Sequence, residues 1–278
     1  MTQENFHLLS RINVVCQDDG DRFTRTDRRD VIREILSGSA YHLLAGEPLF
    51  DLYGKKPLDA LPDSLVLIST HIDCVEEITC FSTRRLPDGL LRGTFDNSLT
   101  NMAAVRLMLD GQLPENAVIA FTGNEEDDSL GAVAVSKYLE KAGKELFVMV
   151  LDVTDMGYDE GKWFTVENNF WENQTAGASI VSASERVTAN WGFVPSDSNE
   201  IPACIPGEKV IRNARGVPFE AECDESWEYD EQNEECFSLC IPVSGPMHSN
   251  AGVLAREESV DAYIRALKEI AGALSNNL

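Results

Sequence analysis

The sequence lacks several features that define common classes of protein. No apolar run approaches the roughly 20 residues that a membrane-spanning helix needs, and the first residues contain no apolar stretch typical of a secretory signal. The seven cysteines are odd in number and show no CxxC spacing, which argues against a disulfide framework and against a zinc ribbon. We therefore expect a cytoplasmic protein, not bound to membranes, whose cysteines are mostly reduced.

Basic residues are scarce relative to acidic ones. Lys and Arg total 23 against 47 Asp and Glu, which gives a formal net charge of −24 at pH 7. A surface with this charge repels nucleic-acid phosphates and anionic lipids, so we expect no nucleic-acid partner. Solubility is the simpler explanation of the excess, and steering of a cationic substrate amine is the alternative.

The 278 residues are 43% hydrophobic, which is enough to bury a core and does not demand more than one domain. We expect residues 1–278 to form a single catalytic domain. Short apolar runs alternate with helical patterns, which is typical of an α/β fold with a mostly parallel or mixed central sheet and helices on both faces. The predicted strands are 65–69, 117–122, 146–151, 163–167 and 237–243. The predicted helices are 4–15, 25–37, 99–109, 129–142 and 257–274, with long loops between 155 and 235.

Polar residues follow the first three of these strands. His71 and Asp73 come after the first, Glu125 and Glu126 after the second, and Asp152 ends the third. Ligands bind at the carboxyl ends of strands in an open α/β sheet, so we expect these side chains to meet. Taken singly, each has a commoner explanation, such as a surface histidine at a strand end or a solvated acidic cluster before a helix.

The spacing within these pairs indicates separate roles. His71 and Asp73 share a face in extended backbone, so Asp73 can hold the ring nitrogen that a metal does not use. Neighbouring residues in extended backbone point to opposite sides, so one of Glu125 and Glu126 can bind metal while the other stays free as a base. Asp152 continues a buried apolar strand, where a carboxylate is costly unless it is paired or bound to metal.

Two further residues complete the candidate set. Asp96 lies in GTFDNSLTN before a predicted helix, where a carboxylate can either bridge two ions or cap the helix. His248 lies in the turn SGPMHSN and is one of only four histidines, which favours a functional role.

These motifs, in this order, resemble the co-catalytic zinc exopeptidases. The order is HxD, then Asp-Asn before a helix, then Glu-Glu after a strand, then a strand-final LDVT, then a loop histidine. The TFDN and PMHS stretches are similar to glutamyl and leucyl aminopeptidases of the larger related family. The resemblance implies a zinc-exopeptidase (phosphorylase-like) three-layer sandwich. Only the 22 residues 74–95 separate Asp73 from Asp96, so no separate dimerisation domain is inserted there and a large shell is not expected, although the oligomeric state stays open.

The resemblance also implies two divalent metal ions, with zinc expected and cobalt or manganese as alternatives. It assigns Asp96 as the bridge between the ions, Glu125 as the general base, and Asp73 as the residue that orients one ligand. Asn97 follows the bridging residue as it does in those relatives. The implied ligands are His71 and Asp152 for one ion, Glu126 and His248 for the other, and Asp96 for both.

The resulting hypothesis is a two-metal aminopeptidase that removes N-terminal residues from peptides. The same metal ligands would serve an N-acyl amino acid deacylase or another amidohydrolase, because the ligands act on the carbonyl while the loops choose the substrate. A non-catalytic metal-binding protein is the third hypothesis, although no ligand or base is missing. Candidates for substrate recognition are Asp224, Glu225 and Trp227.

Overall fold

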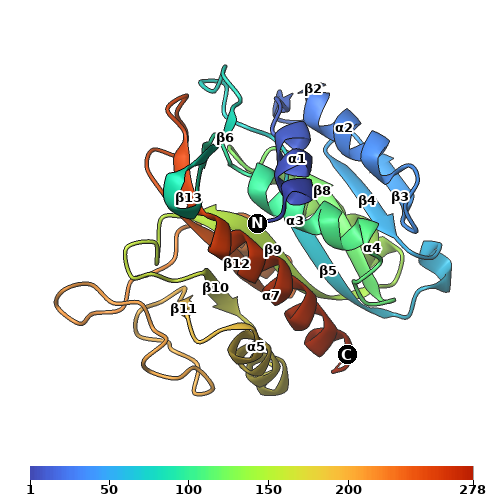
Figure 1. Ribbon diagram of the computed structural model, residues 1–278. Helices are drawn as coiled ribbons and strands as arrows, with labels where there is room; N and C mark the ends of the chain where they lie inside the picture. The colour runs from blue at the N-terminus through green and yellow to red at the C-terminus, as the bar shows by residue number, and fades with distance from the viewer. Residues whose placement is uncertain (278) are drawn as a thin grey trace.

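The computed structural model describes residues 1–277, which form a large mixed sheet with helices on both faces (Figure 1). This confirms the fold class expected from the sequence. Seven α-helices lie within the described residues. They are α1 (Gln3–Ile12), α2 (Asp27–Leu36), α3 (Ser98–Leu109), α4 (Leu130–Lys141), α5 (Gln174–Val187), α6 (Glu225–Glu231) and α7 (Glu257–Ser275).

The main sheet has 11 strands, nine of them in the order β3-β4-β8-β5-β9-β12-β13-β7-β6, while β10 pairs with β12 and β11 pairs with β10. A separate two-stranded sheet joins β1 and β2. The strands are β1 (Gln17–Asp18), β2 (Phe23–Arg25), β3 (His42–Glu47), β4 (Phe50–Gly54), β5 (Ser64–His71), β6 (Thr83–Leu86), β7 (Leu90–Gly93), β8 (Ala117–Thr122), β9 (Glu145–Thr154), β10 (Phe164–Phe170), β11 (Trp191–Val194), β12 (Glu235–Ser244) and β13 (Val253–Arg256).

The centre of the sheet is parallel and almost entirely buried. Strands β8, β5, β9 and β12 run in the same direction as neighbours, and every residue of β8 is buried. Strands buried on both faces are apolar along their whole length, which explains why these segments are recognisable as apolar runs in the sequence. Their carboxyl ends meet at one edge, where His71 of β5 pairs with Thr122 of β8.

Helices cover the two faces unequally. A large hydrophobic core lies between the sheet and α1, α2, α3, α5 and α7, and a smaller one lies on the other face, under α4 and α6. Helices α5 and α7 lie side by side over the β10 and β12 region (Figure 1). The sheet is therefore the middle layer of three.

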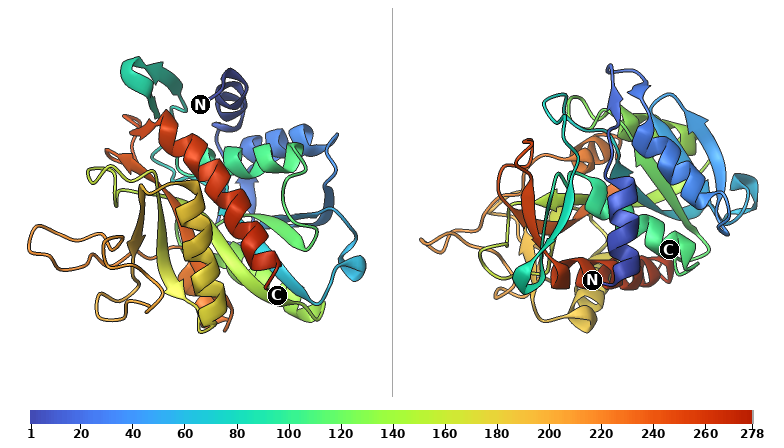
Figure 2. Two further views of the ribbon diagram at one scale, coloured as in Figure 1. Left: turned by 60° about the horizontal axis from the view of Figure 1, so that its bottom comes forward. Right: turned by 45° about the horizontal axis from the view of Figure 1, so that its top comes forward.

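The segment between residues 155 and 235, expected to form long loops, contains more structure than the sequence indicates. It contains β10, α5, β11 and α6, and Asn173 caps α5 by accepting hydrogen bonds from two backbone amides. The expectation of loops holds for residues 155–163 and 195–222. Parts of 195–222 project as orange loops in Figure 2, whereas Val210 and Ile211 of this segment are buried. None of the helices in residues 1–277 combines the length and apolar character needed to cross a bilayer.

Candidate metal centre and active site

The carboxyl ends of three central strands place the first site residues. His71 is the last residue of β5, and the Asn101 amide of α3 holds its carbonyl oxygen through a hydrogen bond of 2.8 Å. Glu125 and Glu126 lie in the turn between β8 and α4, and Asp152 lies near the end of β9. These strand ends converge, because His71 Nε2 lies within 4 Å of carboxylate oxygens of both Glu125 and Asp152.

Asp96 lies between the two histidines of the site. It follows β7, and its Oδ1 is 3.2 Å from His71 Nε2 while its Oδ2 is 3.4 Å from His248 Nε2. His248 is exposed in the loop between β12 and β13, whereas Asp96 and His71 are buried. One carboxylate therefore presents a different oxygen to each imidazole.

Asp96 does not cap α3, which was the alternative role for this residue. The N-cap position of α3 is Asn97, whose side chain makes no capping bond. Instead, Asn97 Nδ2 donates to the carbonyl oxygen of Leu151 at 2.7 Å, one residue before Asp152. Asn97 thereby ties the start of α3 to the end of β9.

The two adjacent glutamates approach different histidines. Glu126 Oε2 lies 3.3 Å from His248 Nε2, and Glu125 Oε2 lies 3.7 Å from His71 Nε2. They occupy a turn and not the extended backbone assumed from the sequence, so that argument for their separation is wrong although the side chains do diverge. Asp152 Oδ1 also faces His71, at 3.6 Å from Nε2.

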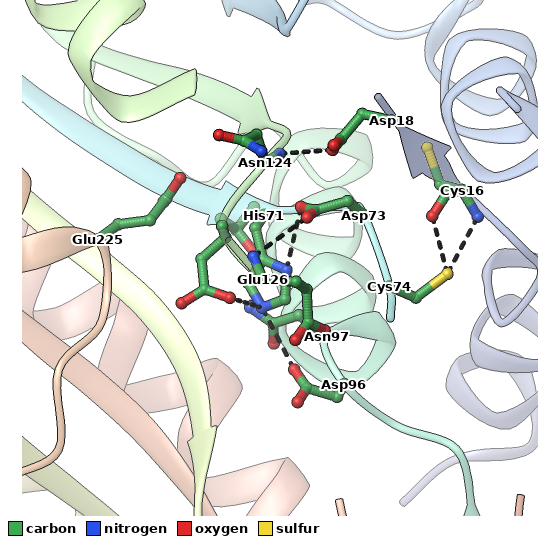
Figure 3. Close-up of polar contacts among 12 residues, drawn as sticks. Cys16, Asp18, His71, Asp73, Cys74, Asp96, Asn97, Asn124, Glu126 and Glu225 are labelled. Atoms are coloured by element: carbon green, nitrogen blue, oxygen red, sulfur yellow. Dashed lines mark hydrogen bonds and ion pairs between the residues drawn. The ribbon is translucent and has the colours of Figure 1, made fainter. Parts of the chain in front are cut away.

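Asp73 connects His71 to the glutamate turn. Its Oδ1 lies 3.4 Å from His71 Nδ1, the ring nitrogen that faces away from Asp96, and its Oδ2 accepts a hydrogen bond of 3.2 Å from the backbone amide of Glu126 (Figure 3). One side chain thus orients the imidazole and anchors the turn that bears the glutamates.

Carboxylates dominate the electrostatics of this cluster. Burial raises the pKa of Glu125 well above its usual value, that of Glu126 to about 8 and that of Asp152 to about 6. Burial alone would lower the pKa of His71, but Glu125 and Asp152 outweigh it and raise that pKa well above its usual value. Five carboxyl groups share this space with two imidazoles, so the excess negative charge is reduced either by protonation, as the raised pKa values show, or by bound cations.

The unpaired polar atoms of the site fit a bound metal. His71 Nε2, Asp96 Oδ1 and Glu126 Oε1 are buried without a hydrogen-bond partner among residues 1–277, which is costly unless an ion fills the space. His71, Asp96 and Glu126 each present a ligand atom, and these atoms lie within 4.8 Å of one another. Imidazole and carboxylate are ligands that suit zinc and related divalent ions.

No protein-family model and no curated protein matches the sequence, but solved structures do match the fold. The TET1 peptidase of Pyrococcus horikoshii superposes with a TM-score of 0.65 and 10% identity over 96% of this chain and 99% of that one. A dinuclear metal-binding peptidase of Bacillus subtilis gives 0.58 and 12% over 100% of both chains. The chain has the fold of these two peptidases.

The fold is not confined to peptidases. Glutaminyl cyclase of Macrostomum lignano superposes with a TM-score of 0.60 and 14% identity over 100% of this chain and 90% of that one. Aminopeptidases also occur among the similar structures. The TET1 peptidase assembles into a tetrahedron or a large octahedral shell, whereas the absence of a large shell for the present chain stays a prediction.

The site opens into an acidic pocket of about 410 Å³. Asp96, Glu125, Glu126, Asp152 and His248 all contribute to its lining, and His71 lies beneath them. Ten of its 17 lining residues are Asp or Glu, and none is Lys or Arg. The negative charge of the pocket therefore favours the binding of a cation.

The substrate-recognition candidates separate in the structure. Asp224 lines the pocket, but neither Glu225 nor Trp227 is among the lining residues. Glu225 is buried under the sheet, where its Oε2 accepts a hydrogen bond of 2.8 Å from Ser69, and Figure 3 shows it set apart from Asp96. Of the three candidates, only Asp224 lies where a substrate could contact it.

Sequence reasoning missed Glu167, which also lines the pocket. It is 4% exposed and lies within β10. A signal was present, because Glu167 is a carboxylate in a buried strand, the same feature that singled out Asp152. It was overlooked because it falls at the end of the predicted strand 163–167, where a polar residue needs no explanation.

Proposed function

We propose that this chain is a two-metal hydrolase that removes N-terminal residues from peptides. The observation that supports this most directly is the placement of Asp96, whose two oxygens face the imidazoles of His71 and His248. A carboxylate with one histidine on each side is suited to bridge two cations. The metallopeptidase fold supports the same proposal.

The ligands divide into two groups around Asp96. His71 and Asp152 form one, since their side chains are 3.6 Å apart, and Glu126 and His248 form the other, at 3.3 Å. Two divalent ions held there, proposed to be zinc, would polarise the scissile carbonyl and make a water molecule more acidic. Asp73 holds the His71 ring in the orientation that directs Nε2 toward Asp96.

Glu125 is the proposed general base. It lines the pocket, and it is not needed to complete either ligand group. Burial raises its pKa, which increases the basicity of its ionised carboxylate and favours acceptance of a proton from water during attack on the carbonyl. The protonated carboxyl then donates that proton to the leaving amine, so the group returns to its starting state.

The charge of the pocket favours an aminopeptidase over the deacylase alternative. An N-acyl amino acid carries a free carboxylate, which the seven acidic lining residues outside the proposed ligand set would repel. A peptide with a free N-terminus brings an ammonium group, which the same residues attract. The non-catalytic alternative is disfavoured because Glu125 is retained in the pocket.

The proposal is tested by measuring metal content and peptidase activity on the same samples. We expect close to two ions per chain for the wild type and release of the amine from aminoacyl-anilides that depends on those ions. His248→Ala should hold less metal and lose activity, whereas His42→Ala, an exposed histidine on β3, should change neither. Two ions with deacylase activity only would replace the aminopeptidase proposal, and no bound metal after incubation with Zn²⁺ or Co²⁺ would overturn it.

A further inference from the structure

Glu167 is a buried carboxylate that faces the pocket without a cation. It is 4% exposed, and its side chain accepts hydrogen bonds from two hydroxyl groups, those of Thr165 and Thr154, neither of which carries a charge. Among residues 1–277 the groups that act on its charge are Thr165, Thr154, Asp152 and Asp224, none of them a cation, and none of the 17 residues lining the pocket is Lys or Arg. A buried carboxylate that has hydroxyl partners but no cationic partner is costly to ionise, so a cation that enters the pocket would stabilise its charged form.

The strand register places Glu167 on the same face of the sheet as the metal-site residues. Asp152 of β9 is level with Cys240 of β12, and Cys240 is level with Thr165 of β10. Residues two apart in a strand share a face, so Glu167 projects on the side of Thr165 and Asp152. Two strand spacings, roughly 10 Å, separate Asp152 from Thr165, and Glu167 lies two residues further along β10, so the backbones of Asp152 and Glu167 are roughly 12 Å apart. A side chain extending from a residue bound near Asp152 can reach this wall.

Helix α6 packs against β10 and supplies the adjacent part of this wall. Asp224 caps the helix, with Oδ1 accepting a hydrogen bond of 2.8 Å from the Ser226 amide, and it lines the pocket together with Glu228. Both side chains come from a different element than Glu167, so three carboxyl groups enclose the same space. All three lie outside the set of proposed metal ligands.

We propose that Glu167, aided by Asp224 and Glu228, binds the cationic side chain of an N-terminal Lys or Arg residue in the peptide substrate. This inference rests on the proposed aminopeptidase function and specifies its substrate class. A Lys or Arg side chain supplies the positive charge that would pair with the Glu167 carboxylate. Its aliphatic part extends from the substrate backbone near Asp152 toward Glu167. A substrate with an acidic first residue meets repulsion from the same three groups.

The first test compares aminoacyl-anilides that differ in the charge of the side chain. We expect the wild type to cleave the Lys and Arg substrates with kcat/KM about 10- to 100-fold higher than the norleucine substrate, which has similar length and no charge, because a buried bond to a charged group contributes that much. The Glu substrate should be the poorest. Equal kcat/KM for Lys and norleucine would overturn the inference while leaving the aminopeptidase proposal intact.

The second test uses Glu167→Gln, which keeps the shape of the side chain and removes its charge. We expect the Lys-to-norleucine ratio of kcat/KM to fall to near 1, with the norleucine value and the metal content unchanged. Glu225→Gln is the matched control, because it also removes one buried carboxyl near the site but does not line the pocket. The control should retain the wild-type ratio.

The outcomes of the second test separate the two proposals. A Glu167→Gln variant that keeps the Lys preference would refute the role of Glu167. Failure of the wild type to cleave any anilide would refute the aminopeptidase function instead. If Glu167→Gln does not fold, as circular dichroism would reveal, the wild-type comparison of Lys with norleucine still decides the substrate class.

Discussion

Exchanging each of the two adjacent glutamates for glutamine should separate chemistry from metal binding. Glu126 presents a ligand atom within 4.8 Å of those of His71 and Asp96. Glu125 is not part of this three-residue cluster. Glu125→Gln should therefore keep both ions and lose activity. Glu126→Gln should lose metal, because one carboxylate ligand becomes an amide, and lose activity as a result.

The expected magnitudes follow from these roles. General acid–base catalysis typically contributes about 10²- to 10⁴-fold, so kcat of Glu125→Gln should fall by that factor, or about 3 to 5 kcal/mol in activation free energy. The assay measures anilide hydrolysis alongside elemental analysis of the same protein. Loss of an ion from Glu125→Gln, or two ions with full activity in Glu126→Gln, would refute the assignment.

Three further predictions concern the support of the site and the fold. Asp73→Asn should weaken metal affinity about 10- to 100-fold in competition with a chelator, and unchanged affinity would contradict its orienting role. Asp51→Ala should lower the free energy of unfolding in urea by about 3 to 5 kcal/mol, because Arg29 at 2.7 Å and Arg33 at 2.6 Å lose their partner. A loss below about 1 kcal/mol would show that these two ion pairs do not stabilise the fold. Burial raises the pKa of Glu225 from 4.5 to about 7, so the folded chain binds this proton more tightly than the unfolded chain and the resulting stability is lost as pH rises from about 4.5 to about 7. Glu225→Gln should therefore gain about 3 kcal/mol relative to the wild type between pH 4 and pH 8 in urea unfolding, and equal pH profiles would contradict the burial argument.

The central sheet and the convergence of the site could be predicted from local sequence. Strands buried on both faces must be apolar throughout, so 117–122 is visible as a run and matches β8 (Ala117–Thr122). Neighbouring parallel strands have their carboxyl ends at the same edge of a sheet, so the sequence predicts that residues at the ends of β5 and β9 meet. His71 and Asp152 illustrate this, at 3.6 Å.

Elements whose formation depends on distant partners could not be predicted in this way. Strand β11 is four residues long and pairs with β10 and, through a single bridge, with Val210. Helix α6 has seven residues and is rich in acidic ones. Neither has a strong local pattern, so the sequence between 155 and 235 resembles loop. The burial of Glu167 has the same origin, because β10 is buried through its pairing with β11 and β12 and through its contacts with α6 and α7.

The metal site and the pocket wall are formed by different elements of the fold. The proposed ligands sit on strand ends and turns of β5, β8 and β9 and on the loops before α3 and after β12, whereas Glu167 and Asp224 belong to β10 and α6. A charge change at Glu167 leaves every proposed ligand and Glu125 in place. Substrate preference should therefore vary independently of hydrolysis at the same metal centre, because the ligands act on the carbonyl common to all peptides while the wall contacts the side chain that differs among them.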